Sequence, residues 1–176
     1  MRAIDSELLT EFLKLAGERL EGDWVLLGGT VLPALGIGDR VTLDIDIAGP
    51  PGGGQEQLLA VMEIAEDLGL PAEAVNPAAA FFLQRIRGWQ KHLVLLHRGA
   101  GARIHRPDAT LFLLLKLRRL SEADLSDCLA MLRFARREGE RLDRARVRRA
   151  LSSEAEKVHS PGWHQRAEIL VQALKT

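Results

Sequence analysis

The chain has 176 residues, of which 47% are hydrophobic and 27% are charged, and its formal net charge is zero. This length favours one compact domain or a domain with a small appendage, and the composition excludes disordered and collagen-like proteins. The longest apolar runs fall far short of the roughly 18 residues that a membrane-spanning helix needs. The first twenty residues carry acids where a secretory signal has an apolar block. We therefore expect a cytoplasmic protein without a membrane segment.

Charge is distributed unevenly along the chain. Residues 1–80 carry 4 basic and 14 acidic side chains, whereas residues 81–176 carry 20 basic and 10 acidic ones. Such asymmetry is typical of a basic surface for nucleic acid or polyphosphate, and equally of two halves that attract each other or a partner. The arginine run between 133 and 149 is either a solvated face or a contact for phosphate backbones. The single cysteine, Cys128, excludes an internal disulfide and is expected in the core.

Helices and strands alternate in the first part of the chain. Residues 6–20 have the apolar spacing of an amphipathic helix, whereas residues 41–48 alternate strictly between apolar and polar side chains, as a half-buried strand does. Glycines after 35, 48 and 68 provide the breaks. The expected elements are a helix over 6–20, a strand over 24–27, a short helix over 30–35, a strand over 41–48 and a helix over 55–68.

The periodicity changes after residue 74. Turn signals at Gly88 and 99–101 separate three short segments, which predicts an antiparallel meander. Asp108 is then a suitable N-cap for the first of several helices. The sequence thus predicts an α/β (α+β) core over 1–107 and a helical C-terminal portion over 108–176 that packs on it. The expected elements are strands over 81–86, 91–97 and 102–105, and helices over 109–120, 121–137, 143–151, 154–158 and 164–174, with 160–162 as an interruption.

Two motifs carry chemistry. At Gly28 and Gly29 no side chain keeps a phosphate from the backbone, and the N–H groups of the following helix, Thr30 included, point at it. Asp44 and Asp46 stand two residues apart, so a strand projects both from one face, about 6–7 Å apart at the backbone. Their carboxylates can converge on one divalent ion or straddle two. An anion cradle beside a dicarboxylate platform is what a nucleoside triphosphate bound with magnesium requires.

These motifs resemble those of the DNA polymerase beta-like nucleotidyltransferase superfamily, in which an apolar strand, a glycine pair and a short helix precede an Asp-x-Asp strand. More narrowly, the chain looks like the small bacterial nucleotidyltransferases related to AbiEii-type toxins, and the resemblance covers residues 24 to about 130. The residues that carry it are Gly28-Gly29-Thr30, Arg40-Val-Thr42-Leu-Asp44-Ile-Asp46, and Lys116-Leu117 followed by Asp124-Leu-Ser-Asp127.

The resemblance implies a nucleotidyltransferase-like mixed sheet flanked by helices. It also implies transfer of a nucleoside monophosphate from a nucleoside triphosphate to a hydroxyl of RNA, such as tRNA, or of a protein, in the manner of a toxin with a cognate antitoxin. Asp44 and Asp46 would then be catalytic and hold Mg²⁺ or Mn²⁺. The nucleotide-binding residues implied are Gly28, Gly29, Thr30 and Lys116.

A different function stays open because residues 74–107 contain no Asp or Glu. The superfamily usually supplies a third carboxylate from this part of the fold. The alternative is therefore a catalytically degenerate module, or a toxin–antitoxin partner, that has kept the fold and lost transferase activity. If transfer takes place without that carboxylate, His92 and His97 are the candidate bases by residue type.

Each motif also has a purely structural interpretation. The two aspartates of the motif are then exposed acids on a wet strand face, and the glycine pair is a simple turn. An Asp-x-Asp strand occurs as well in glycosyltransferases that bind sugar nucleotides through manganese. Lys116 either extends its amine to the surface or reaches a phosphate. Asp124 and Asp127 lie three apart on one helix face, a spacing suited to orienting Lys116 or Arg119.

Overall fold

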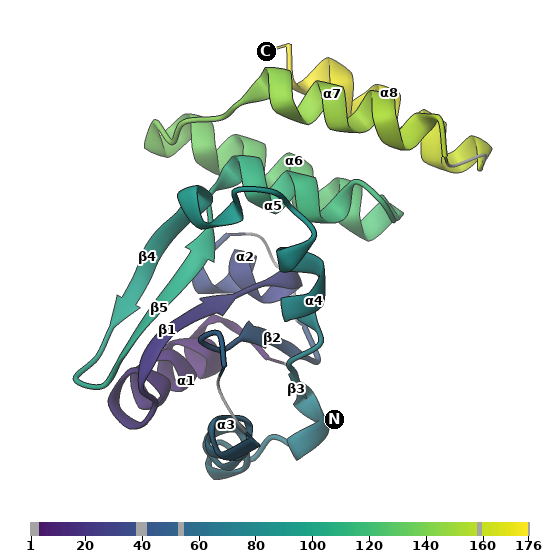
Figure 1. Ribbon diagram of the computed structural model, residues 1–176. Helices are drawn as coiled ribbons and strands as arrows, with labels where there is room; N and C mark the ends of the chain where they lie inside the picture. Colours follow the sequence, from purple (N-terminus) through teal and green to yellow (C-terminus); the bar gives the residue numbers. More distant parts are fainter. Residues whose placement is uncertain (1–3, 38–41, 53–54, 158–159, 176) are drawn as a thin grey trace. The chain divides into compact units, whose positions relative to one another are not determined.

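The structure is a computed structural model that describes residues 4–37, 42–52, 55–157 and 160–175. The chain divides into two compact units, Met1–Pro107 and Asp108–Thr176. The first unit combines helices with a sheet, and the second consists of helices (Figure 1). This confirms the predicted α/β class. None of the helices in the described ranges is long and apolar enough to cross a membrane.

A five-stranded mixed sheet forms the centre of the first unit. Its strands are β1 (Gly22–Leu26), β2 (Ile45–Ala48), β3 (Val75–Asn76), β4 (Leu93–Arg98) and β5 (Ala102–Pro107). They lie in the order β3-β2-β1-β5-β4. β1 pairs antiparallel with β2 and parallel with β5, β2 pairs parallel with β3, and β4 pairs antiparallel with β5. The end of β1 and the start of β2 therefore lie side by side at one end of the sheet's strands.

Two long helices, α1 (Ser6–Arg19) and α3 (Gln55–Asp67), carry most of the apolar residues that cover the sheet. Asp5 caps α1, since its carboxylate accepts a hydrogen bond from the Leu8 N–H at 2.9 Å. The helix packs against β4, β5 and α3. Its apolar stripe is buried there, as the spacing predicts. Core residues shared by these elements include Leu9, Phe12, Ile45, Val61, Ile64 and Ile104.

The strand expected over 41–48 is too long. β2 begins at Ile45, and Thr42 forms only an isolated bridge with Ile4. Leu43, which strict alternation would bury, is 50% exposed. Val41 lies outside the described residues. Asp44 therefore precedes the strand instead of alternating along it.

The strand expected over 81–86 is wrong, because this segment belongs to helix α4 (Ala79–Gln84). Its buried residues, Ala79 and Leu83, are four positions apart, which is a helical spacing, whereas Phe81 and Phe82 are exposed. The other two strands of the predicted meander are present as β4 and β5. The remaining short elements of this unit are η1 (Gly28–Thr30), α2 (Val31–Ala34), η2 (Ala72–Ala74) and η3 (Trp89–His92).

The second unit contains α5 (Ala109–Lys116), α6 (Glu122–Glu138), α7 (Arg144–Ala155) and α8 (Pro161–Ala173). Asp108 caps α5 as expected, and Ser121 with Asp124 forms a capping box at α6. The predicted helices over 143–151 and 154–158 join in α7, with Val158 outside the described ranges. Pro161 opens α8 instead of interrupting it, because proline suits the first helical position, where no N–H bond is lost.

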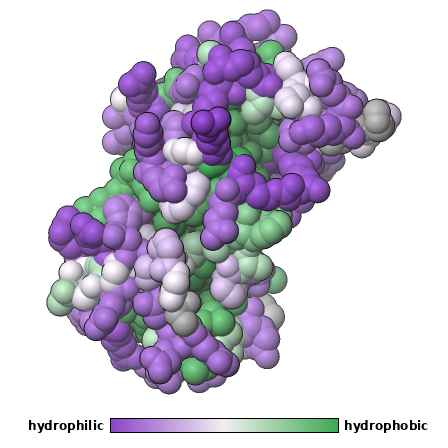
Figure 2. All heavy atoms as spheres, viewed as in Figure 1, coloured by the Kyte–Doolittle hydropathy of each residue, from purple (hydrophilic) through white to green (hydrophobic). Residues whose placement is uncertain are grey.

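Most of the face shown in Figure 2 is hydrophilic, and apolar residues reach the surface in several places. Isolated apolar residues on a surface are ordinary, whereas a neighbouring pair of aromatic rings is not. The large hydrophobic side chains exposed in the described part of the chain are Leu43, Leu59, Phe81, Phe82, Leu95 and Ile169.

Candidate functional site

The glycine turn, Gly28 and Gly29, follows the end of β1 and lies in direct contact with Asp46. After β1 the chain turns through Gly28, whose φ of +63° is in the left-handed region. The Leu27 N–H donates to the Asp46 carbonyl oxygen at 2.7 Å, which places β2 beside the turn. A Cβ on Gly28 would lie 2.7 Å from the Asp46 Cγ and overlap its Oδ2. Both the backbone angle and the space therefore require glycine here.

The carboxylate of Asp46 is oriented from the opposite side by Asn76. Asp46 and Asn76 are register partners in β2 and β3, and the Asn76 Nδ2 donates to the Asp46 Oδ1 at 2.6 Å. The Asn76 Oδ1 in turn accepts from the Ala78 N–H at 3.2 Å. Asp46 itself is half-buried. Asn76 is not among the site residues predicted from the sequence, where the one signal is a polar residue that follows an apolar pair and directly precedes Pro77.

Thr30 is buried and holds the turn to β2. Its hydroxyl donates to the Leu27 carbonyl oxygen at 3.0 Å and accepts from the Asp46 N–H at 3.3 Å. Both contacts lie inside the protein, so the hydroxyl positions Asp46 rather than presenting itself to a ligand. Gly29 lies in the same turn within η1 and is half-buried.

Replacing Thr30 with valine is expected to lower the free energy of unfolding by about 1–3 kcal/mol, because the buried Asp46 N–H and Leu27 carbonyl lose their shared partner. Thr10→Val is the matched control: its hydroxyl bonds the Ser6 carbonyl on the exposed face of α1, where such a change costs about 0.5 kcal/mol or less. Urea unfolding of both variants measures the difference. Equal losses would show that the Thr30 hydroxyl does not fix the turn.

Asp44 is exposed and lies one residue before β2. Its backbone N–H donates to the Thr42 hydroxyl oxygen at 3.4 Å, and its backbone carbonyl oxygen accepts from that hydroxyl at 3.2 Å. The prediction that a strand projects Asp44 and Asp46 together is therefore wrong for Asp44. What holds is that the exposed Asp44 stands two residues before Asp46, whose carboxylate lies against the glycine turn.

Among the described residues, no third acidic side chain completes a metal site with Asp44 and Asp46. No set of three or more His, Cys, Asp or Glu side chains that could hold a metal is found in that part of the chain. β5, which lies beside β1, contributes Arg103, His105 and Arg106 but no acid. The acid-free segment 74–107 thus includes β5, the strand beside the one that leads into the glycine turn.

The two histidines considered as bases lie away from Asp46. Both belong to the segment that forms the far edge of the sheet, with β1 and β5 between β4 and β2. Three strand spacings amount to about 14 Å. His97 also lies at the opposite end, where a Cβ built on Gly17 of α1 would meet its ring at 2.8 Å. His92 immediately precedes β4, at the end of the sheet where β1 terminates.

Lys116 belongs to the second unit, where it forms a buried charge cluster. Its Nζ donates to the Asp124 Oδ1 at 3.2 Å and the Asp127 Oδ2 at 2.8 Å, and all three side chains are buried. Arg119 donates twice to Asp124, at 2.7 Å and 2.8 Å. The orienting role expected of the two acids is thus present. Lys116 is held by them, and its expected contact with a phosphate gains no support.

The surroundings of Asp124 in this cluster favour its ionised, carboxylate form. Burial raises the pKa of Asp124, but the hydrogen bonds from Arg119 and Ser121 and the Lys116 charge outweigh it and hold the pKa well below its ordinary value of 3.8. Close by, burial raises the pKa of the Cys128 thiol to about 12. The cysteine is therefore a core residue, as the sequence predicts, and not a nucleophile.

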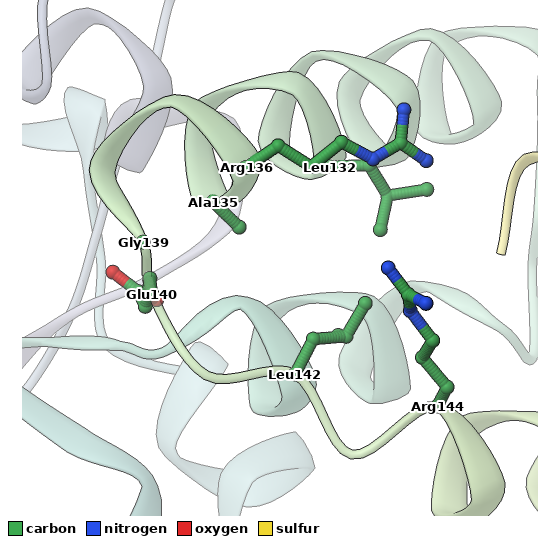
Figure 3. A pocket seen from close by; sticks show the side chains of 7 residues that line it. All are labelled: Leu132, Ala135, Arg136, Gly139, Glu140, Leu142 and Arg144. Atoms are coloured by element: carbon green, nitrogen blue, oxygen red, sulfur yellow. The ribbon is translucent and has the colours of Figure 1, made fainter. Parts of the chain in front are cut away.

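A pocket of about 380 Å³ lies where α6 ends and α7 begins. Figure 3 shows Arg136 and Arg144 extending toward each other from the two sides of the pocket, with Leu132 beside Arg136 and Leu142 beside Arg144. The Arg136 guanidinium also donates to the Ala173 carbonyl oxygen at 2.5 Å. Two members of the arginine run thus line a cavity, which contains none of the site residues predicted from the sequence.

Comparisons of the chain with protein-family models, with curated proteins and with solved structures find no match.

Proposed function

We propose that the first unit binds a nucleoside triphosphate with a divalent cation at the glycine turn, and transfers its nucleoside monophosphate to a hydroxyl of RNA or protein. One observation carries the proposal: the Asp46 carboxylate occupies the space that the absent side chain of Gly28 leaves. A carboxylate oriented against a side-chain-free turn brings a metal ligand next to the backbone that a phosphate can approach. The resemblance to nucleotidyltransferases rests on these same residues.

The residues present fit one Mg²⁺ or Mn²⁺ ion. Magnesium is usually held by one or two carboxylates together with substrate phosphates and water, and not by a cage made entirely of protein groups. Asp46, held by Asn76, would supply one carboxylate, and the exposed Asp44 two residues earlier would supply a second. When bound, the ion would neutralise phosphate charge and polarise the phosphorus toward attack. Gly28 leaves room for the Asp46 carboxylate, Gly29 would receive the phosphates, and Thr30 would hold Asp46 at the turn.

In the proposed transfer the hydroxyl oxygen of the acceptor bonds to the α-phosphorus, and the bond from that phosphorus to pyrophosphate breaks. The proton of the hydroxyl needs a base, and β5 supplies no carboxylate beside the turn. This specific absence favours a second candidate function, in which the unit binds the metal nucleotide and does not transfer it. Incubation with labelled triphosphates, Mg²⁺ or Mn²⁺ and bulk tRNA separates the two functions.

Asp46→Asn is expected to weaken triphosphate binding in Mg²⁺ by about 10–100-fold, because the amide keeps the size of the side chain and removes the charge that holds the ion. Asp44→Asn is expected to act in the same direction. With a chelator in place of Mg²⁺, both variants should bind as weakly as the unaltered protein. Calorimetric titration with and without Mg²⁺ measures these affinities.

Asp67→Asn, an exposed acid on α3 paired with Arg19, is the matched control and should leave the affinity unchanged. Affinity that is independent of Mg²⁺ in the unaltered protein would contradict the metal platform. Loss of binding in the control as well would indicate a general charge effect.

A further inference from the structure

Two neighbouring phenylalanines are exposed on α4. Phe81 is 61% exposed and Phe82 is 53% exposed, although the same helix buries Ala79 and Leu83 against the protein. The two rings meet edge to face, with centroids 5.8 Å apart and an interplanar angle of 79°. Single exposed apolar side chains are ordinary, whereas contiguous exposed apolar groups mark binding sites. The pair is therefore a surface that needs an explanation.

This surface is tied to the strand that carries Asp46. Helix α4 packs against β2, as does the glycine turn in η1 (Figure 1). It begins three residues after Asn76, whose side-chain Nδ2 donates to the Asp46 carboxylate and whose side-chain Oδ1 accepts from the Ala78 N–H. A short, hydrogen-bonded segment thus links the aromatic pair to the proposed metal ligand. Helix α4 and the glycine turn thus contact the same strand.

The charge around the pair indicates the chemistry of that molecule. The Arg85 guanidinium lies 5.5 Å from the centroid of the Phe81 ring, and Arg87 follows in the chain. No acid occurs anywhere in residues 74–107. An aromatic face beside arginine, in an acid-free segment, suits a flat π system that carries phosphate. A nucleoside triphosphate is such a molecule.

We propose that Phe81, supported by the edge of Phe82 and by Arg85, is the platform on which the base of the bound nucleotide stacks. This inference rests on the proposed function, since it assigns a place to the base of the same triphosphate. Stacking on a ring face reads no hydrogen-bond pattern, so the platform accepts every base and holds the larger purines more tightly. Phe81 thereby contributes to affinity for the nucleoside part and not for the phosphates.

The experiment compares two probes, Mg·ATP and Mg·tripolyphosphate, which differ only in the nucleoside. Phe81→Ala is expected to weaken Mg·ATP binding by about 5- to 150-fold, the loss that corresponds to removing one base–aromatic stack, and to leave tripolyphosphate binding unchanged. Phe81→Trp should restore ATP affinity, because it restores a ring face. Leu59→Ala, which removes a leucine that is 50% exposed on α3, is the control and should change neither affinity.

The outcomes separate this inference from the proposed function. Equal ATP affinity in Phe81→Ala, in Phe82→Ala and in the unaltered protein overturns the platform and leaves the nucleotide site intact. Equal loss for ATP and tripolyphosphate also overturns it, since the phenylalanine would then be structural. An unaltered protein that binds neither probe overturns the proposed function and the platform together. If Phe81→Ala loses binding of single-stranded oligoadenylate but not of ATP, the surface serves a nucleic-acid strand and the assignment is wrong.

Discussion

Gly28→Ala is expected to abolish magnesium-dependent nucleotide binding and to lower the free energy of unfolding by about 2–5 kcal/mol. A left-handed backbone costs a non-glycine residue about 1–2 kcal/mol. The new methyl group would also overlap the Asp46 Oδ2, so the carboxylate must move away from the turn and lose its bond to Asn76. Loss of a buried hydrogen bond adds about 1–3 kcal/mol.

Gly36→Ala separates the two contributions. Gly36 has a φ of +64°, close to the +63° of Gly28, and a Cβ built there meets nothing within 4 Å. This control should therefore lose only the backbone contribution of about 1–2 kcal/mol and bind nucleotide normally. Urea unfolding and calorimetric titration of both variants provide the comparison. If the two variants lose the same stability and the same nucleotide affinity, the contact between Gly28 and Asp46 does not contribute to nucleotide binding.

Asp124→Ala is expected to destabilise the second unit by about 3–5 kcal/mol, because it leaves the buried Lys116 ammonium with one partner instead of two. The same change removes the capping box at the start of α6. Arg119→Ala is the matched comparison. It removes a guanidinium that is 74% exposed and leaves Asp124 bonded to Lys116 and Ser121, so we expect a smaller loss of stability than in Asp124→Ala. Hydrogen exchange of the α6 amides reports the stability of this unit.

The pH dependence follows from the direction of the Asp124 shift. Its pKa is lower in the folded protein than in the unfolded chain, where it is about 3.9. The stabilisation is therefore complete above that value and is lost as the pH falls below about 4. Asp124→Asn should lack this acid-dependent component of α6 protection. A variant that loses protection with acid as steeply as the unaltered protein would contradict the assignment.

The sequence by itself determines most of the elements and the location of the motif. The apolar spacing of α1 and α3, the Asp5, Asp108 and Ser121 caps and the turn before β5 are local signals, and each element follows. The order of strand, glycine turn and short helix before Asp46 can likewise be read along the chain. Local signals suffice because capping and periodicity involve residues within about four positions of each other.

Tertiary structure alone decides what the motif residues contact. The hydroxyl of Thr30 turns inward because β2 brings the Asp46 N–H to it, sixteen positions away. Asn76 reaches Asp46 only through the pairing of β2 with β3. In the same way, contacts between α5 and α6 bury Lys116 between two acids.

The two mistaken strands have the same physical origin. Leu43 and Phe81 are apolar, and hydrophobicity alone predicts that they are buried, whereas burial depends on whether another element covers the position. In the folded protein Leu43 lies ahead of β2, and Phe81 lies on the outer face of α4. Pattern along the chain therefore specifies which elements form, and packing between distant segments specifies which side chains remain available to a ligand.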